Sequence, residues 1–214
     1  MKALIITGGE SPPADFLLKL AHASGLVLAA DSGFDTALAA GIDPELIVGD
    51  FDSLSDRSLL SRIPKSRILS YPRDKDETDT EIAIRAARDR GATALALAGG
   101  GGGRLDHLVA ILRLFERRDP PQEWHTRRES SFFLAPGTAA RFLAEPGSLV
   151  SVFPLGEGLC EGMESRGLQW PLDRLVWKRG YFGVSNRSLS PTLELKAGSA
   201  PLLIMLPLGS ELLA

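Results

Sequence analysis

The first 117 residues repeat one pattern, in which a short apolar segment leads into a turn with glycine or aspartate and then into an amphipathic helix. Strands with apolar residues at nearly every position are typical of a parallel sheet that helices cover on both faces. The pattern predicts strands at residues 3–7, 26–30, 46–48, 67–70 and 94–98. It predicts helices at residues 12–24, 33–40, 54–62, 78–90 and 105–117. Ligands of such sheets bind beyond the carboxyl ends of the strands, so the turns after the strands are the first candidates for a site.

The pattern changes after residue 117. Pro120 and Pro121 end the last helix, and the residues beyond them are punctuated by Gly, Pro, Ser and Asn without a helical period. Short runs predict strands at residues 123–126, 130–134, 149–153, 192–195 and 202–206. We therefore predict an α/β protein with two domains. Residues 1–130 form a Rossmann-like domain with helices on both faces of a parallel sheet, and residues 131–214 form a smaller all-β sandwich or barrel.

Composition excludes several classes of protein. With 44% hydrophobic and 24% charged residues, the 214-residue chain resembles an ordinary soluble protein, and its net charge of -3 gives no long-range attraction to nucleic acid. The only cysteine, Cys160, excludes an intrachain disulfide and disfavours a zinc site built from cysteines. No apolar run approaches the roughly 20 residues of a membrane span, and the N-terminal run is too short for a secretory signal. We expect a cytoplasmic protein without a nucleic-acid or membrane partner.

The segment Gly49-Asp50-Phe51-Asp52-Ser53 follows the third expected strand. On an extended backbone, Asp50 and Asp52 would project to one side while Phe51 turns toward the core. Two carboxylates in one small space repel each other unless a cation lies between them, and a hard ion such as Mg²⁺ prefers oxygen ligands. The alternative is structural: the aspartates form a turn, and Ser53 caps the next helix. These residues alone leave both interpretations open.

A second polar segment, residues 71–79, runs from the fourth strand into a helix whose start, Thr78-Asp79-Thr80-Glu81, fits a capping box. Its interleaved charges are typical of a solvated turn near a helix dipole. Among the acidic residues of this segment, Asp76 and Asp79 are the best candidates for additional metal ligands or for anchors of such ligands. Lys75 is a candidate for phosphate binding.

Five glycines at residues 99–103 follow the fifth strand and lead into Arg104, Asp106 and His107. Glycine amides can approach a polyanion closely, the next helix offers its positive end, and Arg104 can grip phosphate oxygens. No Walker A sequence follows, and no register of the run fits GxGxxG. The alternative is a flexible loop, in which Asp106 and His107 serve as structural braces.

Four further positions carry polar or aromatic groups suited to a ligand. Asp31 ends the second strand and is either a helix cap or a site carboxylate. Trp170 precedes a proline, which keeps it extended, so its ring is either a flat surface for a planar ligand or an ordinary core residue. Ser185 and Asn186 either hydrogen-bond a heterocycle or form a turn.

Taken together, these motifs closely resemble those of the thiamine pyrophosphokinase family. The resemblance rests on residues 49–53, 74–79, 99–107, 167–172 and 183–186, in this order, and extends from near residue 1 to near residue 206. It implies a nucleotide-binding catalytic domain at residues 1–130 and a β-sandwich thiamine-binding domain at residues 131–214. It also implies a homodimer that binds thiamine where the subunits meet.

The family transfers a pyrophosphoryl group from ATP to the hydroxyl of thiamine and releases AMP. The resemblance implies catalytic roles for Asp50, Asp52, Asp76, Asp79 and Arg104. Mg²⁺ would be held by Asp50, Asp52 and Asp79. Nucleotide contacts would come from Asp31, Lys75, Gly100, Gly101, Gly102, Gly103, Asp106 and His107. Thiamine contacts would come from Trp170, Ser185 and Asn186.

Two other functions fit part of this pattern. A related diphosphokinase that acts on a pterin alcohol would share the Asp-Phe-Asp-Ser chemistry, but Trp170 and Ser185-Asn186 favour thiamine. A sensor of nucleotide or thiamine diphosphate would not need the crowded carboxylates of Asp50 and Asp52.

Overall fold

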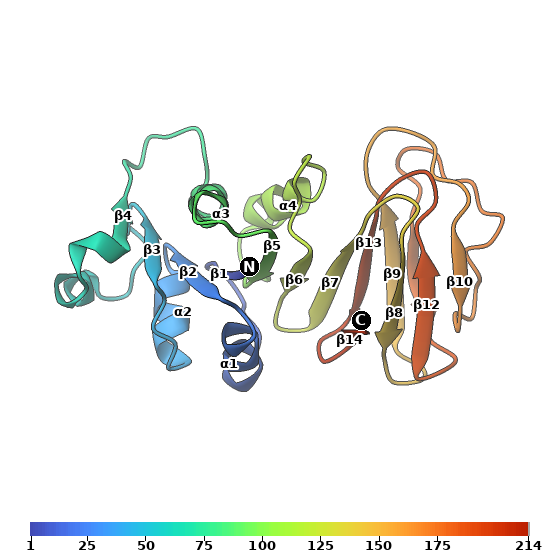
Figure 1. Ribbon diagram of the computed structural model, residues 1–214, viewed down its shortest axis with the longest axis horizontal. Coiled ribbons are helices and arrows are strands. Elements are labelled where there is room, and N and C mark those ends of the chain that lie inside the picture. The colour runs from blue at the N-terminus through green and yellow to red at the C-terminus, as the bar shows by residue number, and fades with distance from the viewer. Residues whose placement is uncertain (214) are drawn as a thin grey trace. The chain divides into compact units, whose positions relative to one another are not determined.

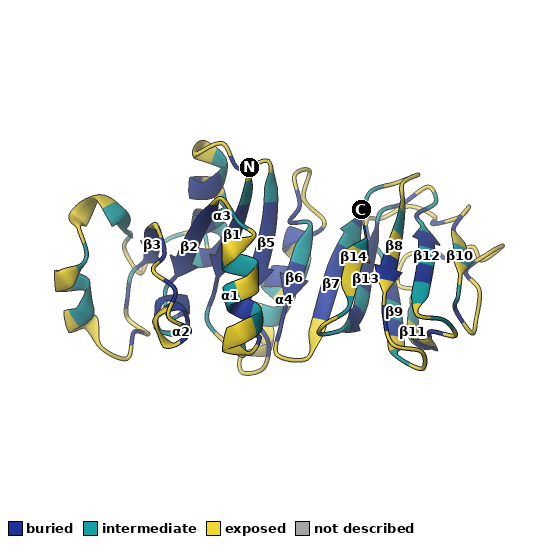
Figure 2. Cartoon of the chain, turned by 60° about the horizontal axis from the view of Figure 1, so that its bottom comes forward, coloured by how far each residue is buried: buried dark blue, intermediate teal, exposed yellow. Residues whose placement is uncertain are grey.

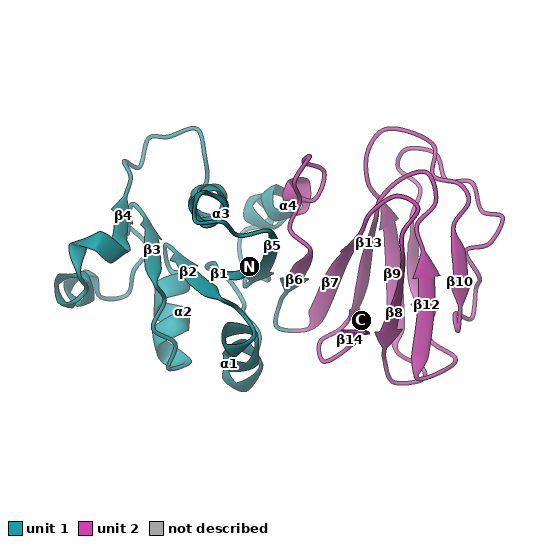
Figure 3. Cartoon of the chain, in the orientation of Figure 1, with its two compact units in different colours: residues 1–111, 124–127 teal, residues 112–123, 128–214 magenta. Residues whose placement is uncertain are grey.

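The computed structural model describes residues 1–213, and the chain divides into two compact units (Figure 3). Unit 1 contains Met1–Ile111 and Trp124–Arg127, and unit 2 contains Leu112–Glu123 and the residues from Arg128 onward. The chain passes from one unit to the other after residues 111, 123 and 127. The sequence predicted two domains that divide at residue 130.

Unit 1 is built on a parallel sheet with strand order β5-β1-β2-β3-β4, and β6 follows β5 in this order. Most residues of β1, β2, β3 and β5 are buried, which explains their continuous apolar sequences (Figure 2). The prediction of a parallel sheet is confirmed. The bounds are β1 Lys2–Ile6, β2 Leu26–Ala30, β3 Leu46–Gly49, β4 Ile68–Ser70, β5 Ala94–Ala98 and β6 Glu123–His125.

The α-helices of residues 1–213 lie on both sides of this sheet, with α1 and α2 on one side and α3 and α4 on the other (Figure 1). The predicted capping box starts α3: Thr78 Oγ1 accepts a hydrogen bond from the Glu81 N–H (3.3 Å), and Glu81 Oε2 accepts one from the Thr78 N–H (2.8 Å). The bounds are α1 Ala14–His22, α2 Gly33–Ala39, α3 Asp79–Asp89 and α4 Leu105–Leu114.

The strand order places a topological switch point between β1 and β5. From β1, the chain adds β2, β3 and β4 on one side, and β5 then pairs with the other side of β1. Because these strands are parallel, their carboxyl ends share one edge of the sheet. Sheets of this kind bind ligands at that edge, near the switch point.

One predicted helix is wrong. Residues 54–62 form only a 3₁₀ helix, η1 (Arg57–Arg62), followed by η2 (Lys65–Arg67). The cap of η1 is Asp56, which accepts a hydrogen bond from the Ser58 N–H (2.8 Å), whereas the Ser53 hydroxyl donates to Asp52 (3.0 Å). The apolar residues of this segment pack on one cluster but do not follow an α-helical stripe; they are Leu54, Leu59, Leu60 and Ile63.

Unit 2 contains two antiparallel sheets, with strand orders β11-β9-β13-β7 and β10-β12-β8-β14. Phe132 and Val152 from the first sheet and Phe142 from the second belong to one buried cluster, so the sheets share a core. The bounds are β7 Glu129–Leu134, β8 Ala139–Leu143, β9 Leu149–Pro154, β10 Glu164–Arg166, β11 Gly183–Arg187, β12 Thr192–Lys196, β13 Leu202–Pro207 and β14 Glu211–Leu213.

Most strands that the sequence missed in unit 2 are short or exposed. β10 and β14 have three residues each, and β10 and β11 are mostly exposed, so they lack the apolar signal of β9 and β13. Within residues 1–213, none of the helices combines the length and the apolar character that a membrane crossing requires.

Candidate active site

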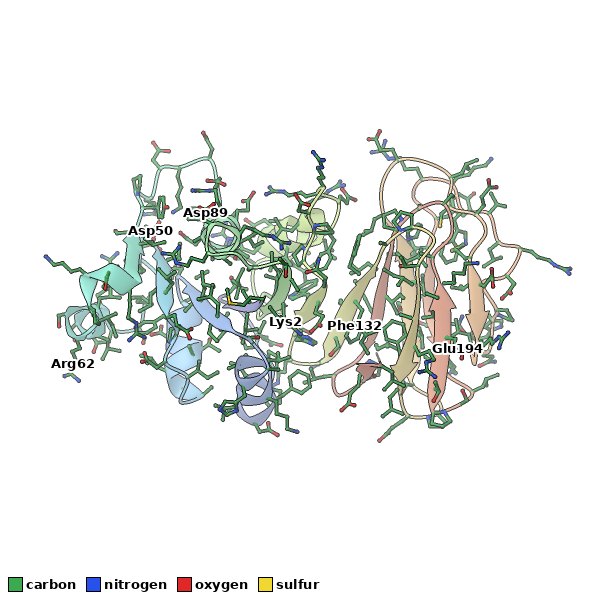
Figure 4. All side chains as sticks on the ribbon, viewed as in Figure 1. Lys2, Asp50, Arg62, Asp89, Phe132 and Glu194 are labelled. Carbon is green, nitrogen blue, oxygen red and sulfur yellow. The ribbon has the colours of Figure 1, made fainter. Side chains whose placement is uncertain are left out.

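Three aspartates meet at the carboxyl ends of β2 and β3. Asp31 follows β2, while Asp50 and Asp52 follow β3; Figure 4 labels Asp50 at this end of the strand. One carboxylate oxygen from each of the three lies within 4.8 Å of the other two. Asp50 and Asp52 therefore share one space, as the sequence predicted. Asp31, expected among the nucleotide contacts, is the third member of this acidic cluster.

The backbone conformation that brings Asp50 and Asp52 together differs from the expected one. β3 ends at Gly49, and Phe51 has a φ of 63°, so the segment is a turn and not an extended strand. The Asp52 N–H donates to Asp50 Oδ1 at 3.0 Å. Phe51 still points inward, with only 5% of its surface exposed. A bulky residue in the left-handed region costs about 1–3 kcal/mol, which the surrounding structure must offset.

Asp31 lies in a second unusual turn. Its φ is 48°, and its N–H donates to the Val48 carbonyl at 2.8 Å, which ties the end of β2 to β3. Its Oδ1 atom is buried and has no hydrogen-bond partner among residues 1–213. A buried carboxylate oxygen without a donor is unfavourable. Three carboxylates with one unsatisfied oxygen are suited to a hard divalent cation such as Mg²⁺.

Lys75 bridges two of the acidic residues. Its Nζ lies 3.5 Å from Asp50 Oδ2 and 3.2 Å from Asp79 Oδ1, and it donates to the Pro72 carbonyl at 3.2 Å. Only 13% of the Lys75 side chain is exposed. Asp79, the first residue of α3, is therefore paired with Lys75 and lies outside the group of three carboxylates.

Burial and pairing shift the pKa values of these groups. The Asp52 N–H lowers the pKa of Asp50 against the opposing effect of burial, and the charge of Lys75 lowers it further. Burial raises the pKa of Asp79 more than Lys75 lowers it. Burial also acts to lower the pKa of Lys75, but the hydrogen bond and charges of Asp79 and Asp50 raise it overall. The site therefore keeps an ionised Asp50 beside a cationic Lys75.

A second cation screens the acidic cluster. Arg73 Nε lies 3.4 Å from Asp52 Oδ2, although 86% of the Arg73 side chain is exposed. Asp76 is exposed, and its side chain has no hydrogen bond or ion pair within the described part of the chain. The structure thus gathers Asp50, Asp52 and Lys75 but does not bring Asp76 into contact with them.

The glycine run has two parts with different surroundings. The first three residues are buried, and each of their N–H groups is already used. Gly99 donates to the His125 carbonyl (3.0 Å), Gly100 to that of Gly8 (2.7 Å), and Gly101 to that of Glu10 (3.3 Å). The N–H groups of these three residues therefore hold the loop after β1 and the segment that begins at Trp124, and they are not free to bind a polyanion.

Gly102 and Gly103 are exposed and adopt φ values of 60° and 63°. They lead into Arg104, whose Nε and Nη2 donate to the two carboxylate oxygens of Asp106 at 3.1 and 2.6 Å. The hydrogen bond from Arg104 lowers the pKa of Asp106 to about 2. Asp106 also accepts from the N–H of His107, whose side chain is exposed. Arg104 thus shows the forked geometry that also suits phosphate oxygens.

A buried pair of hydroxyls joins the switch point to α3. Thr7 Oγ1 and Thr80 Oγ1 lie 2.8 Å apart, one directly after β1 and the other in the first turn of α3. Both residues are buried. The contact fixes the N-terminus of α3, and so Asp79, relative to the strand ends. The sequence carried no signal for it, because threonines 73 positions apart show no pattern.

In unit 2, Trp170 is 55% exposed and is therefore not a core residue, unlike Trp177. The buried Asn186 side chain holds the Trp170 backbone from both sides: Oδ1 accepts from the Trp170 N–H (3.1 Å), and Nδ2 donates to its carbonyl (2.7 Å). Asn186 therefore positions the Trp170 segment and has little capacity left for a ligand. Ser185 is exposed, with a φ of 60°.

Comparison with known proteins agrees with this geometry. Residues 17–122 match the family model of the thiamin pyrophosphokinase catalytic domain, and this segment contains the acidic cluster, Lys75 and the glycine run. No curated protein sequence matches the chain.

Several solved structures resemble the whole chain. Thiamin pyrophosphokinase from Geobacillus thermodenitrificans shares 26% identity with a TM-score of 0.74, over 97% of each chain. Thiamine pyrophosphokinase from Bacillus subtilis shares 21% identity with a TM-score of 0.79, over 97% of this chain and 99% of that one. A thiamin pyrophosphokinase family protein from Enterococcus faecalis shares 22% identity with a TM-score of 0.78, over the same fractions. With its catalytic-domain match and this fold, the chain belongs to the thiamin pyrophosphokinase family.

Proposed function

We propose that this protein is an ATP-dependent thiamine pyrophosphokinase. It transfers the pyrophosphoryl group of ATP to the hydroxyl of thiamine and forms thiamine diphosphate and AMP. The observation that carries this proposal is the acidic cluster of Asp31, Asp50 and Asp52, which lies within the segment that matches the family's catalytic domain. A Rossmann-like fold for unit 1 and a β-sandwich fold for unit 2 are consistent with the sheets described above.

The acidic cluster fits the Mg²⁺ ion that this reaction implies. Asp31, Asp50 and Asp52 would hold it, since all three offer oxygen ligands and Asp31 Oδ1 has no other partner within residues 1–213. When bound, the ion supplies positive charge for the polyphosphate. If Lys75 turns to a phosphate oxygen, Asp79 is released from its ion pair and can join the ligands.

The remaining groups of unit 1 bind and orient the phosphates. The exposed Gly102 and Gly103 offer backbone amides near the start of α4, and Arg104 can exchange the carboxylate of Asp106 for phosphate oxygens. Asp106 and His107 would then act as braces. The transition state of phosphoryl transfer is loose, so positioning and charge contribute more than a strong base.

We extend the proposal to thiamine binding in unit 2. The exposed Trp170 ring offers a flat surface, and cation–π attraction to the thiazolium would contribute about 0.5–2 kcal/mol. Asn186 would act through Trp170, while the exposed Ser185 remains a candidate for direct contact. Tyr181 and Phe182 are also exposed, which supports a homodimer with thiamine at the subunit interface. The free, buried Cys160 fits a cytoplasmic location.

An AMP-release assay tests the proposal. The wild-type protein should release AMP from ATP with thiamine and not with hydroxymethylpterin. Turnover of the pterin alone would overturn the substrate assignment, and nucleotide binding without any turnover would indicate a sensor. Asp52→Asn should abolish turnover while the circular dichroism spectrum stays unchanged, because Asp52 is exposed and contributes no packing. Unchanged turnover in this variant would remove the metal assignment.

A further inference from the structure

The turn that carries Asp50 and Asp52 has an unusual backbone, and one side chain binds it from outside the acidic cluster. Arg57 Nε donates to the Phe51 carbonyl at 2.5 Å, and Arg57 Nη2 donates to the Asp50 carbonyl at 3.0 Å. One guanidinium therefore holds two successive carbonyl oxygens. These hydrogen bonds require both peptide groups to face the same side, which the left-handed Phe51 makes possible.

Arg57 is itself held in place by the segment that precedes η1. It is the first residue of η1, whose cap Asp56 accepts from the Ser58 N–H. The Ser55 N–H donates to Asp35 Oδ2 at 2.8 Å, which ties the segment to α2. Leu54 is buried in the same cluster as the Phe51 ring. The guanidinium therefore reaches the turn from an anchored backbone.

Arg57 differs in kind from the other two cations near the acidic cluster. Arg73 and Lys75 lie 3.4 and 3.5 Å from carboxylate oxygens, so they occupy atoms that a metal ion would use. Arg57 makes no ion pair within the described residues and binds only backbone oxygens of the turn. Arg57 therefore does not itself occupy any carboxylate oxygen of Asp50 or Asp52.

We propose that Arg57 is a positioning residue for the acidic cluster: its fork fixes the strained turn and so keeps the Asp50 and Asp52 carboxylates together for a divalent cation. The inference rests on the proposed metal site. A guanidinium supplies two donors in one rigid plane, whereas a lysine ammonium is a point charge that does not reproduce this geometry. Residues that orient metal ligands typically change metal affinity by about 10- to 100-fold when they are replaced.

Binding of Mn²⁺ to the whole protein, followed by electron paramagnetic resonance, tests the proposal without substrates. Arg57→Gln and Arg57→Lys should each weaken Mn²⁺ binding by about 10- to 100-fold. The matched control is Arg73→Gln. Arg73 is a nearby exposed arginine that contacts a carboxylate oxygen and no backbone carbonyl of the turn, so this variant should bind Mn²⁺ as tightly as the wild type or more tightly. Hydrogen exchange should rise in residues 49–55 of both Arg57 variants and stay unchanged elsewhere.

The results distinguish a positioning role of Arg57 from an effect of its charge alone. If Arg57 acted only through its charge, Arg57→Gln would bind Mn²⁺ more tightly and Arg57→Lys would match the wild type; either result overturns the proposal. Equal weakening by Arg73→Gln would also overturn it. Should Arg57→Gln lose its fold, Arg57→Lys decides alone. If the wild type binds no Mn²⁺, or if Asp52→Asn leaves Mn²⁺ binding intact, the proposed metal site fails and not only the role of Arg57.

Discussion

Replacing Gly100 by alanine should destabilise unit 1, and the structure explains why. Gly100 has a φ of 74°, a conformation that costs an alanine about 1–2 kcal/mol. A Cβ atom at Gly100 would also collide with Cδ1 of the buried Ile111. Overpacking of a filled core costs typically about 1–3 kcal/mol. The expected loss in free energy of unfolding is therefore about 2–5 kcal/mol.

Gly103→Ala is the matched control. Gly103 has a similar φ of 63°, but apart from its two chain neighbours no atom of residues 1–213 lies within 4 Å of the position of an added Cβ. It should lose only the backbone contribution of about 1–2 kcal/mol. Chemical denaturation followed by the circular dichroism of helices suits this comparison, because α1, α2 and α3 lie wholly in unit 1.

The difference between the two variants isolates the contact with Ile111. If Gly100→Ala and Gly103→Ala lose equal stability, the loop adjusts freely and the reasoning from the crowded contact is refuted. Gly103→Ala should in addition raise the KM for ATP, because its exposed amide is proposed to bind phosphate. If Gly100→Ala, measured under conditions where it is fully folded, raised the KM for ATP more than Gly103→Ala does, the division of the glycine run into two parts would be contradicted.

Three further predictions concern single contacts. Asp31→Asn should weaken Mn²⁺ binding without loss of stability, since Asp31 Oδ1 has no protein partner in residues 1–213; unchanged binding by electron paramagnetic resonance would contradict it. Trp170→Ala should raise the KM for thiamine far more than that for ATP, and Asn186→Ala should do the same because Asn186 holds Trp170; equal changes in both KM values would contradict a thiamine contact. In Arg104→Gln, the pKa of Asp106 measured by NMR should rise from about 2 toward 3.8, because the hydrogen bond from Arg104 is the largest cause of its lowering. A lowered pKa means that this pair stabilises the fold above pH 3.8 and that its contribution disappears as the pH falls toward 2, so the stability difference between wild type and Arg104→Gln should shrink over that range.

The sequence predicted the architecture well where one physical rule acts locally. Continuous apolar strands predict a buried parallel sheet, and the capping box at Thr78 marks the start of α3. It failed between residues 54 and 62, where apolar residues alone suggested a helix. Those residues serve tertiary packing around Phe51, and the segment forms only a 3₁₀ helix.

The sequence predicted only the part of the candidate site that depends on residues close together in the chain. Asp50 and Asp52 lie near each other in the sequence, so their proximity followed from two residues alone. Asp31 lies 19 residues before Asp50 and meets it only because β2 and β3 are parallel neighbours with a common edge. The partner of Asn186 was likewise invisible, because its hydrogen bonds to Trp170, 16 residues away, leave no spacing to read.

By itself, the sequence determined which chemical groups this protein carries and at which ends of its strands they lie, because strand alternation, capping and glycine content act over a few residues. Only the tertiary structure decided which of those groups are already engaged. The amides of Gly99, Gly100 and Gly101 are used by other loops, the Asn186 amide is used by Trp170, and Arg57 is bound to two carbonyls. The physical reason is that a donor's availability depends on the atoms that surround it in space, and the fold alone sets those.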